Sequence, residues 1–331
     1  MTPSVSVFGA AGYAGALSAR LLHRHPTFEL RAVTSRSDAG RRLDELYPHH
    51  RVPLELEQLD FDRHAEVDAA VVAYPHGAAA EVVAELVARG VRVVDLSADF
   101  RLRDPAAYAE WYRPHPRPEL IAEAVYGLPE CYREQIPGAR IVANPGCYPT
   151  ATVLALAPLA RAGVLGEVIV DAKSGASGAG RAATDKTHFV SVDENVSAYG
   201  VPRHRHTPEI EQELAALGAD LRITFTPHLL PLDQGELVSC YVTLVDGEPQ
   251  DARALYQEAY ADEPFVELSD RPPGVRDVRE TNICRVSVHC DERTGRLIVF
   301  AAIDNLWKGA ASQAVQNLNL MFERPESEGL L

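Results

Sequence analysis

The feature that most constrains the fold is the alternation of short apolar runs with helical segments through the first 143 residues. The apolar runs are SVSVFG, FELRAVTS, VDAAVVAYP, VRVVDLS and ARIVANP, and the helical segments are AGALSARLLHRH and GAAAEVVAELVARG. Strands of a parallel sheet are covered on both faces and therefore read as nearly continuous apolar runs. The pattern predicts an α/β domain with a doubly wound parallel sheet of Rossmann type.

From about residue 164 the runs become longer and few helices separate them: EVIVDAKSG, LRITFTPHL, ELVSCYVTLV, ICRVSVHC and RLIVFAAID. This pattern predicts a second α+β domain on a mixed or antiparallel sheet. A length of 331 residues also exceeds the roughly 250–300 residues at which one core stops growing. We predict a first domain of residues 1–146 with 306–331, to which the last helix (309–323) returns, and a catalytic and oligomerisation domain of residues 147–305.

The charge and the cysteines restrict the class of protein. A net charge of −15 argues against binding to nucleic acid or to an acidic membrane surface. The longest apolar run, 151–172, is interrupted by Pro158, Arg161 and Glu167, and the first basic residue is Arg20, so neither a membrane span nor a signal peptide is expected. Five cysteines without a CxxC pair indicate a reduced, cytoplasmic protein.

The segment GAAGYAG places Gly9, Gly12 and Gly15 between the first strand and the first helix, which is the context of a dinucleotide-binding loop. Glycines let the backbone approach a pyrophosphate, and the helix N-terminus attracts its charge. The alternative is a plain tight turn. At the end of the second strand, Ser35 and Arg36 stand where NAD-binding domains usually have an acid. Arg36 could pair with a 2′-phosphate, so NADP is favoured over NAD. The alternative is that Arg36 is a surface arginine exposed to solvent.

Cys147 lies at a turn, in NPGCYPT, directly before an expected helix at 150–162. In the first turn of that helix, the helix dipole and the backbone N–H groups would stabilise a reactive thiolate, and the same N–H groups could bind an oxyanion. The alternative, a small buried apolar side chain, suits the cysteines in strand-like runs better. Cys147 is therefore the candidate nucleophile.

A thiolate nucleophile needs a proton shuttle, and RHRHTPEI offers His204 and His206. If this segment is extended, both side chains point the same way. Thr207 is the expected N-cap and Pro208 the first residue of a helix over 208–217. His-x-His can also be a metal pair with His188 or His228 as further ligands, but no carboxylate pattern supports a metal site.

Other candidate binding segments lie at strand ends. The sequence KSGASGAGR (173–181) could contact a phosphate or carboxylate, or could be a flexible connection. YPHG (74–77) and DLSADFRL (95–102) follow strands of the first domain, at the edge where doubly wound sheets bind ligands.

Together these motifs resemble those of the N-acetyl-gamma-glutamyl-phosphate reductases of arginine biosynthesis, which are related to the aspartate-semialdehyde dehydrogenases. The resemblance runs through GAAGYAG, SRSDAG, YPHG, DLSADFRL, YGLPE, NPGCYPT, KSGASGAGR, HRHTPEI, TPHLLP and AIDNLWKGAASQAVQNLN. It implies an NADP-dependent acyl-phosphate reductase and a homo-oligomer, dimer or tetramer.

The resemblance also implies roles for single residues. Cys147 attacks the acyl phosphate and expels phosphate, NADPH reduces the thioester, and the resulting hemithioacetal collapses to the semialdehyde, with His206 as acid/base. The implied cofactor-binding residues are Gly9, Ala11, Gly12, Tyr13, Ala14, Gly15, Ser35, Arg36, Pro75, His76, Gly77, Ser177, Gly178 and Asn305. The implied substrate-binding residues are Arg101, Asn144, Lys173, Ser174, Arg181 and His204.

Two segments depart from the family pattern: Leu232-Asp233-Gln234-Gly235, where a methionine and an arginine usually precede the glycine, and RETNIC near residue 280. Three other functions stay open. One is reduction of an N-blocked aminoadipyl phosphate of lysine biosynthesis, free or carried on a small protein. A one-methylene difference between substrates is worth only about 1–3 kcal/mol in a pocket. The others are a non-catalytic NADP-binding protein and a thiol hydrolase.

Overall fold

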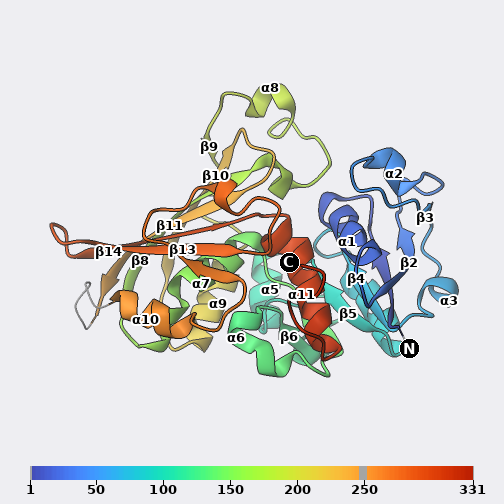
Figure 1. Cartoon of the computed structure of the whole chain (residues 1–331), viewed down its shortest axis with the longest axis horizontal. Coiled ribbons are helices and arrows are strands. Elements are labelled where there is room, and N and C mark those ends of the chain that lie inside the picture. Colours follow the sequence, from blue (N-terminus) through green and yellow to red (C-terminus); the bar gives the residue numbers. More distant parts are fainter. Residues whose placement is uncertain (1, 246–251, 331) are drawn as a thin grey trace. The chain divides into compact units, whose positions relative to one another are not determined.

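The first sheet is parallel throughout, in the strand order β3-β2-β1-β4-β5-β7-β6 (Figure 1). The computed structural model describes residues 2–245 and 252–330. The strands of this sheet are β1 (Ser4–Phe8), β2 (Glu29–Thr34), β3 (Leu56–Glu57), β4 (Ala69–Val72), β5 (Arg92–Asp95), β6 (Ala124–Tyr126) and β7 (Ile141–Ala143). The order reverses between β1 and β4, the switch point where such sheets bind ligands. The predicted doubly wound parallel sheet is confirmed.

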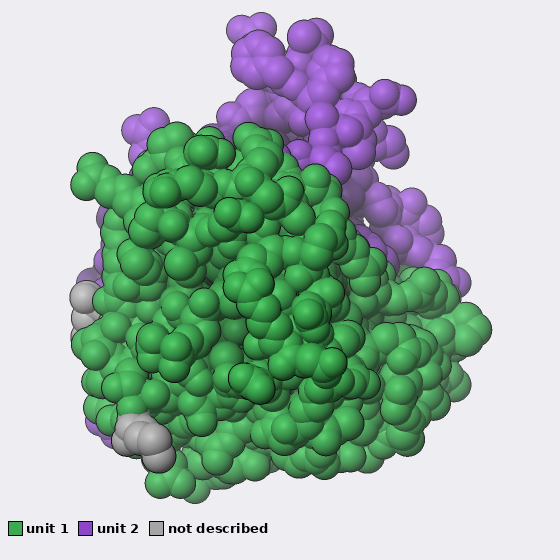
Figure 2. All heavy atoms as spheres, turned by 90° about the vertical axis from the view of Figure 1, so that its right-hand side faces the viewer, with its two compact units in different colours: residues 1–146, 310–331 green, residues 147–309 purple. Residues whose placement is uncertain are grey.

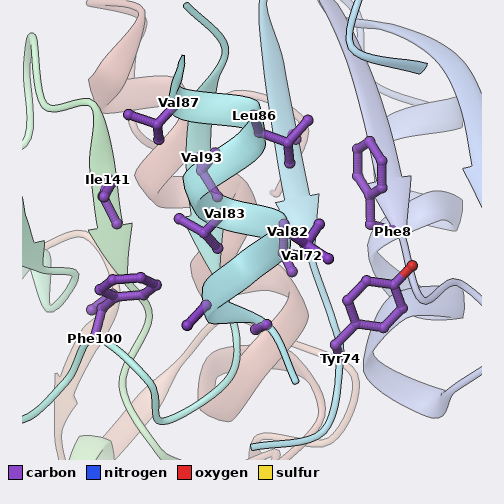
Figure 3. Packing of buried hydrophobic residues seen from close by; sticks show 14 of the residues in the cluster. Phe8, Val72, Tyr74, Val82, Val83, Leu86, Val87, Val93, Phe100 and Ile141 are labelled. Carbon is purple, nitrogen blue, oxygen red and sulfur yellow. The ribbon is translucent and has the colours of Figure 1, made fainter. Parts of the chain in front are cut away.

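Helix α4 shows how this sheet is covered. Its side chains Val82, Val83 and Leu86 pack against Val72 and Val93 in the centre of the sheet (Figure 3), and each such buried side chain contributes about 1.5–3 kcal/mol. Helices α1 and α11 pack against each other and on the strands. The helices described with this sheet are α1 (Tyr13–His23), α2 (Leu43–Leu46), α3 (Phe61–His64), α4 (Ala80–Ala88), α5 (Pro105–Trp111), α6 (Pro129–Tyr132) and α11 (Ser312–Met321).

The second sheet is mixed, in the order β12-β13-β14-β11-β8-β10-β9. The pairs β8–β10 and β12–β13 are parallel and the other neighbours are antiparallel. Its strands are β8 (Leu165–Gly175), β9 (Ser197–Ala198), β10 (Ile223–Leu230), β11 (Glu236–Leu244), β12 (Val266–Leu268), β13 (Cys284–Asp291) and β14 (Arg296–Ile303). The predicted second domain with a mixed sheet is confirmed.

Helix α7 (Cys147–Arg161) lies on this second sheet and contacts β8, β11, β13 and β14. Every residue from Tyr148 to Ala160 is buried. The helix begins at Cys147 itself, three residues before the predicted start, because Pro149 needs no hydrogen-bonded N–H in a first turn. The other helices described here are α8 (Phe189–Val192), α9 (Thr207–Ala216) and α10 (Ala252–Ala259).

The chain divides into two units, coloured separately in Figure 2. Unit 1 runs to Gly146 and resumes at Ala310, and unit 2 runs from Cys147 to Gly309. The expected C-terminal helix is a π-helical turn, Trp307–Ala311, followed by α11. Among the described residues, none of the helices is long and apolar enough to cross a bilayer.

Candidate active site

Two glycines of GAAGYAG are required by the fold itself. Gly9 has a φ of +86°, and a Cβ there would lie 2.6 Å from the carbonyl oxygen of Ala73. A Cβ on Gly15 would lie 2.4 Å from the carbonyl oxygen of Gly9. Gly12 differs, because its nearest neighbour would be 3.7 Å away. The missing side chain of Gly12, the N-cap residue of α1, therefore leaves room for a ligand at the helix N-terminus, as a dinucleotide requires.

This difference predicts opposite effects of two alanine substitutions. Gly15→Ala should lower the free energy of unfolding by about 2–3 kcal/mol, because backbone must move to admit the methyl group. Gly12→Ala should leave stability nearly unchanged and weaken cofactor binding. Denaturant unfolding and a fluorescence titration with NADPH measure the two quantities. Equal stability of the two variants would contradict the assigned roles.

Two charged residues follow β2: Arg36, which is exposed, and Asp38, which is paired within the protein. Arg36 is exposed, and its guanidinium carbon lies 5.0 Å from the ring centroid of Tyr74. Asp38 is buried and forms an ion pair of 3.2 Å with Arg41, and its backbone N–H donates to the Ser35 hydroxyl. The acid near this strand end is thus engaged within the protein, while Arg36 remains available to an anion.

The YPHG loop is held by Asp99, whose structural role the sequence did not reveal. The buried carboxylate of Asp99 accepts hydrogen bonds from the backbone N–H of Gly77 (2.5 Å) and of Ala80 (3.0 Å) and from the hydroxyl of Tyr108. The ring of His76 accepts from the backbone of Ala98 (3.0 Å). The two strand-end segments therefore form one ordered structure. Pro75 and His76 are exposed on it.

Arg101 and Asn144, both predicted to bind substrate, lie together in unit 1. The buried guanidinium of Arg101 donates to the carbonyl oxygens of Asn144 and Leu96, both at 2.7 Å. The amide of Asn144 donates to the carbonyl oxygen of Ala310 and accepts from Asn317. These contacts hold the backbone that leads from β7 to Cys147.

Cys147 is half-buried and is the first residue of α7. A Cβ on Gly309 would lie only 2.8 Å from the Cβ of Cys147, so the nucleophile packs against a position that admits only glycine. Glu236 is fully buried, and neither of its carboxylate oxygens has a hydrogen-bond partner among the described residues. Burial raises the pKa of Glu236 to about 8, against a lowering effect of Cys147. Nothing in the sequence alone marks Glu236 as a site residue.

His204 and His206 both reach the residue that follows the nucleophile. Their ring centroids lie 5.7 and 5.9 Å from that of Tyr148 and 4.9 Å from each other. Burial lowers the pKa of His204 to about 4, with a smaller contribution from Arg205, so this imidazole is neutral at pH 7. The Tyr148 hydroxyl accepts a hydrogen bond of 3.1 Å from the Tyr199 hydroxyl.

Two expectations about these histidines are wrong in detail. The segment is a turn rather than an extended strand, and the backbone N–H of His206 donates to the ring of His204 (3.2 Å). His206, rather than Thr207, is the N-cap residue of α9. The rings meet through this turn, and the turn orients both toward Tyr148. Among the described residues, no group of three or more His, Cys, Asp or Glu could hold a metal ion.

The KSGASGAGR segment is partly strand and partly a 3₁₀ turn. Its backbone N–H groups at Gly175, Ala176 and Ser177 donate to carbonyl oxygens of Gly235, Leu232 and Asp233, respectively. The Asn305 amide donates to the hydroxyl of Ser177 (3.0 Å) and accepts from the N–H of Gly235 (2.7 Å). Ser177, Gly178 and Asn305 thus lie together. The unusual residues 232–235 take part through their backbone, which explains how their side chains can differ.

Lys173 lies apart from the other predicted substrate-binding residues of this segment. Consecutive residues of a strand point to opposite faces, and Ser174 is buried on the face that carries Glu236. The Lys173 ammonium instead bonds to Asp171 (2.6 Å) and to the Ser239 hydroxyl (3.3 Å). Arg181 is exposed. The substrate-binding roles of both residues stay predictions.

The family models assign both halves of the chain. Residues 4–139 match the semialdehyde dehydrogenase NAD binding domain, and residues 147–305 match the semialdehyde dehydrogenase dimerisation domain. The N-acetyl-gamma-glutamyl-phosphate reductase of Desulforudis audaxviator is 49% identical over 99% of this chain and 97% of the relative. The chain belongs to the N-acetyl-gamma-glutamyl-phosphate reductase family. The reductase of Halorhodospira halophila is 50% identical, over 98% of this chain and 97% of its own.

Solved structures with the same fold are aspartate semialdehyde dehydrogenases. The enzyme II of Vibrio cholerae, complexed with ASA, superposes with a TM-score of 0.74 at 19% identity over 98% of this chain and 99% of its own. The enzyme of Candida albicans with NADP superposes with a TM-score of 0.74 at 15% identity, over 97% of this chain and 99% of its own. This chain therefore shares the two-domain fold of these enzymes, and its residues 4–139 form a nicotinamide-cofactor-binding domain.

Proposed function

We propose that this chain catalyses the NADPH-dependent reduction of N-acetyl-gamma-glutamyl phosphate to N-acetylglutamate 5-semialdehyde and phosphate, a step of arginine biosynthesis. The observation that carries the proposal is the placement of Cys147 at the first residue of a buried helix, with both histidine rings against the next residue. The proposal is supported by family relatives that are about half identical over nearly the whole chain.

The thiolate of Cys147 attacks the carbonyl carbon of the acyl phosphate, the sulfur–carbon bond forms, and the bond to the phosphate oxygen breaks. The start of α7 stabilises the thiolate and the developing oxyanion through its N–H groups and dipole. The Gly12 loop would hold the nicotinamide cofactor, which would supply the hydride that reduces the thioester. His206 protonates the resulting oxyanion and then removes that proton as the carbon–sulfur bond breaks to release the semialdehyde.

Other residues have proposed binding roles. Ser174 and His204 lie in unit 2 with Cys147, and we assign them to the substrate. The substrate-binding roles of Lys173 and Arg181 rest on the family resemblance alone. Arg101 and Asn144 would act through the backbone before Cys147. Ser177 and Asn305 are joined by a hydrogen bond, Gly178 lies beside Asn305, and we propose that these three residues contact the cofactor. The name of the matching dimerisation domain supports a homo-oligomer, and the free cysteines suit the reducing cytoplasm.

NADP specificity is assigned to Arg36, and Arg36→Ala tests it. Loss of a charged hydrogen bond to the 2′-phosphate costs about 1.5–3 kcal/mol, so the Kd for NADPH should rise roughly 10- to 100-fold while the Kd for NADH stays unchanged. Arg31→Ala is the matched control, because Arg31 is exposed on β2, the strand that Arg36 follows, and pairs with Glu29. Fluorescence titration of both cofactors gives the constants. An equal loss of NADH affinity would refute a phosphate contact.

The substrate is tested in the reverse direction. Purified protein receives N-acetylglutamate semialdehyde, phosphate and NADP⁺, and NADPH absorbance is followed, with the aminoadipate analogue in parallel. Phosphate-dependent NADPH formation with the glutamate compound is expected. A preference for the longer compound would assign the chain to lysine biosynthesis instead. No turnover of either compound would overturn the proposal for free substrates.

A further inference from the structure

A buried acid beside the nucleophile has no role in the mechanism described so far. Glu236 is the first residue of β11 and is fully buried. Among the described residues, neither of its carboxylate oxygens has a hydrogen-bond partner, and the side chain of Cys147 is close enough to lower its pKa. A buried carboxyl group without such partners is costly, so its retention next to a reactive sulfur calls for a chemical explanation.

The strand register places Glu236 and Cys147 together independently of that interaction. Glu236 pairs across the sheet with Ser174 on one side and with Ile303 on the other, and paired residues share a face. The same face carries Val238 and Cys240, both buried, and α7 contacts both β11 and β14.

Gly309 confirms the placement from the other side. A Cβ there would meet the Cβ of Cys147 at 2.8 Å and the Cδ1 of Ile303 at 3.3 Å. Cys147 thus adjoins the residue that stands opposite Glu236 in the sheet. The sulfur and the carboxyl group lie on the same side of β11, under the start of α7.

The surroundings of this pair contain few charges. The groups that act on Glu236 are Cys147, and Asp304 at the end of β14, which raises its pKa further. Tyr148 and Tyr199 also face it, and burial holds the pKa of each hydroxyl above its ordinary value, so both stay neutral. The pair therefore titrates as a unit that resists carrying two negative charges.

We propose that Glu236 is a second catalytic acid–base, which holds the proton of Cys147 for the lifetime of the thioester; this inference rests on the proposed function. The reactive form is the pair that has lost one proton to solvent: its carboxylate takes the proton of Cys147 as the S–H bond breaks, and the sulfur–carbon bond forms as phosphate leaves. When the hemithioacetal collapses, its hydroxyl proton goes to His206, the carbon–sulfur bond breaks, and the sulfur recovers its proton from Glu236. His206 thus exchanges protons with the substrate oxygen, and Glu236 exchanges a proton with the sulfur of Cys147.

The acidities of the two groups suit this exchange. Burial raises the pKa of Glu236 to about 8, into the range in which thiols titrate. Proton transfer between groups of matched pKa is nearly thermoneutral in both directions, which a group that must accept and return one proton requires. Asp304 and the two tyrosines keep the site from gaining a further negative charge.

The first test needs no substrate. Iodoacetamide alkylation of Cys147, read by peptide mass spectrometry, is compared between wild type and E236Q from pH 6.5 to 9.5. At pH 7 the rates should agree within about twofold, because a neutral acid and a neutral amide affect the thiolate alike. At pH 9 the variant should react roughly threefold or more faster, because ionised Glu236 opposes the thiolate only in the wild type.

The second test is turnover in the reverse assay. E236Q should lose on the order of 10²-fold in kcat, the usual contribution of an acid–base group, although its thiol is the more reactive one at pH 9. Added formate should restore part of the activity of E236A and none of that of E236Q. E213Q is the matched control, because Glu213 is equally buried on α9 and bonds to Gln212; it should keep wild-type turnover.

The outcomes separate the inference from the proposed function. Wild-type turnover in E236Q, or equal alkylation of both proteins at pH 9, would overturn the role of Glu236 while the reductase function stands. An inactive wild type would overturn the function itself. If E236Q fails to fold, the alkylation rate of Cys147 in the wild type is measured as a function of pH. The rate is expected to rise in two steps, the first near pH 8, and a curve with a single step would refute the coupling.

Discussion

Cys147→Ser is expected to abolish reduction, with a loss of at least the order of 10³-fold in kcat. A hydroxyl has neither the nucleophilicity of a thiolate nor its ability to leave as the hemithioacetal collapses. The substitution replaces sulfur by the smaller oxygen at the packed start of α7, so the fold should survive. The reverse assay measures the loss, and thermal unfolding verifies that the variant is folded.

Cys290→Ser is the matched control for this substitution. Cys290 is also half-buried but lies in β13 of the second sheet, and no catalytic role is assigned to it. Its variant should retain wild-type kcat. Activity of Cys147→Ser within tenfold of the wild type would exclude a covalent mechanism through this residue.

His206→Asn is expected to lower kcat by about 10²- to 10³-fold, the contribution of a positioned general acid–base. The asparagine keeps a polar side chain at the N-cap of α9, so the turn should be preserved. The pH profile of kcat should lose the limb that reports imidazole ionisation. Stopped-flow assays from pH 5.5 to 9 measure both effects.

His204→Asn distinguishes the two rings. The low pKa of His204, about 4, keeps it neutral throughout that range, so it should contribute no ionisation and its variant should lose less than about tenfold in kcat. A larger loss in His204→Asn than in His206→Asn would reverse the assignment. Persistence of the same pH limb in His206→Asn would identify another group as the acid–base.

The architecture of both sheets could be predicted because each apolar run is long enough to show whether its strand is buried on one face or on both. Runs such as VDAAVVAYP have no polar alternation, which only strands covered on both faces tolerate. The helix starts were less accurate, because they depend on caps. Pro149 is acceptable in a first turn, so α7 begins at Cys147 and not at residue 150. His206 is the N-cap residue of α9 because its backbone N–H bonds to the ring of His204 and forms a turn. Strand periodicity cannot reveal this contact.

The reactive residues of the candidate site could be predicted from their residue types. Residues whose role depends on the face of a sheet that they occupy were missed. The run EVIVDAKSG predicts a strand through Gly175, as β8 confirms, but grouping Lys173 with Ser174 as substrate-binding residues ignores the alternation that turns Lys173 away from Ser174. In ELVSCYVTLV, alternation already put Glu236 on the face of Cys240. An acid at the start of a strand is ordinarily solvated, so only the packing of α7 over that face showed that it is buried.

The most direct test of the central claim is to detect the thioester. Wild-type protein is mixed with N-acetyl-gamma-glutamyl phosphate without cofactor, quenched with acid, and analysed for released phosphate and for the mass of the Cys147 peptide. The account predicts a burst of phosphate equivalent to the protein present, with the acyl group on Cys147. Phosphate release with an unmodified Cys147 peptide, or acylation of another residue, would contradict it.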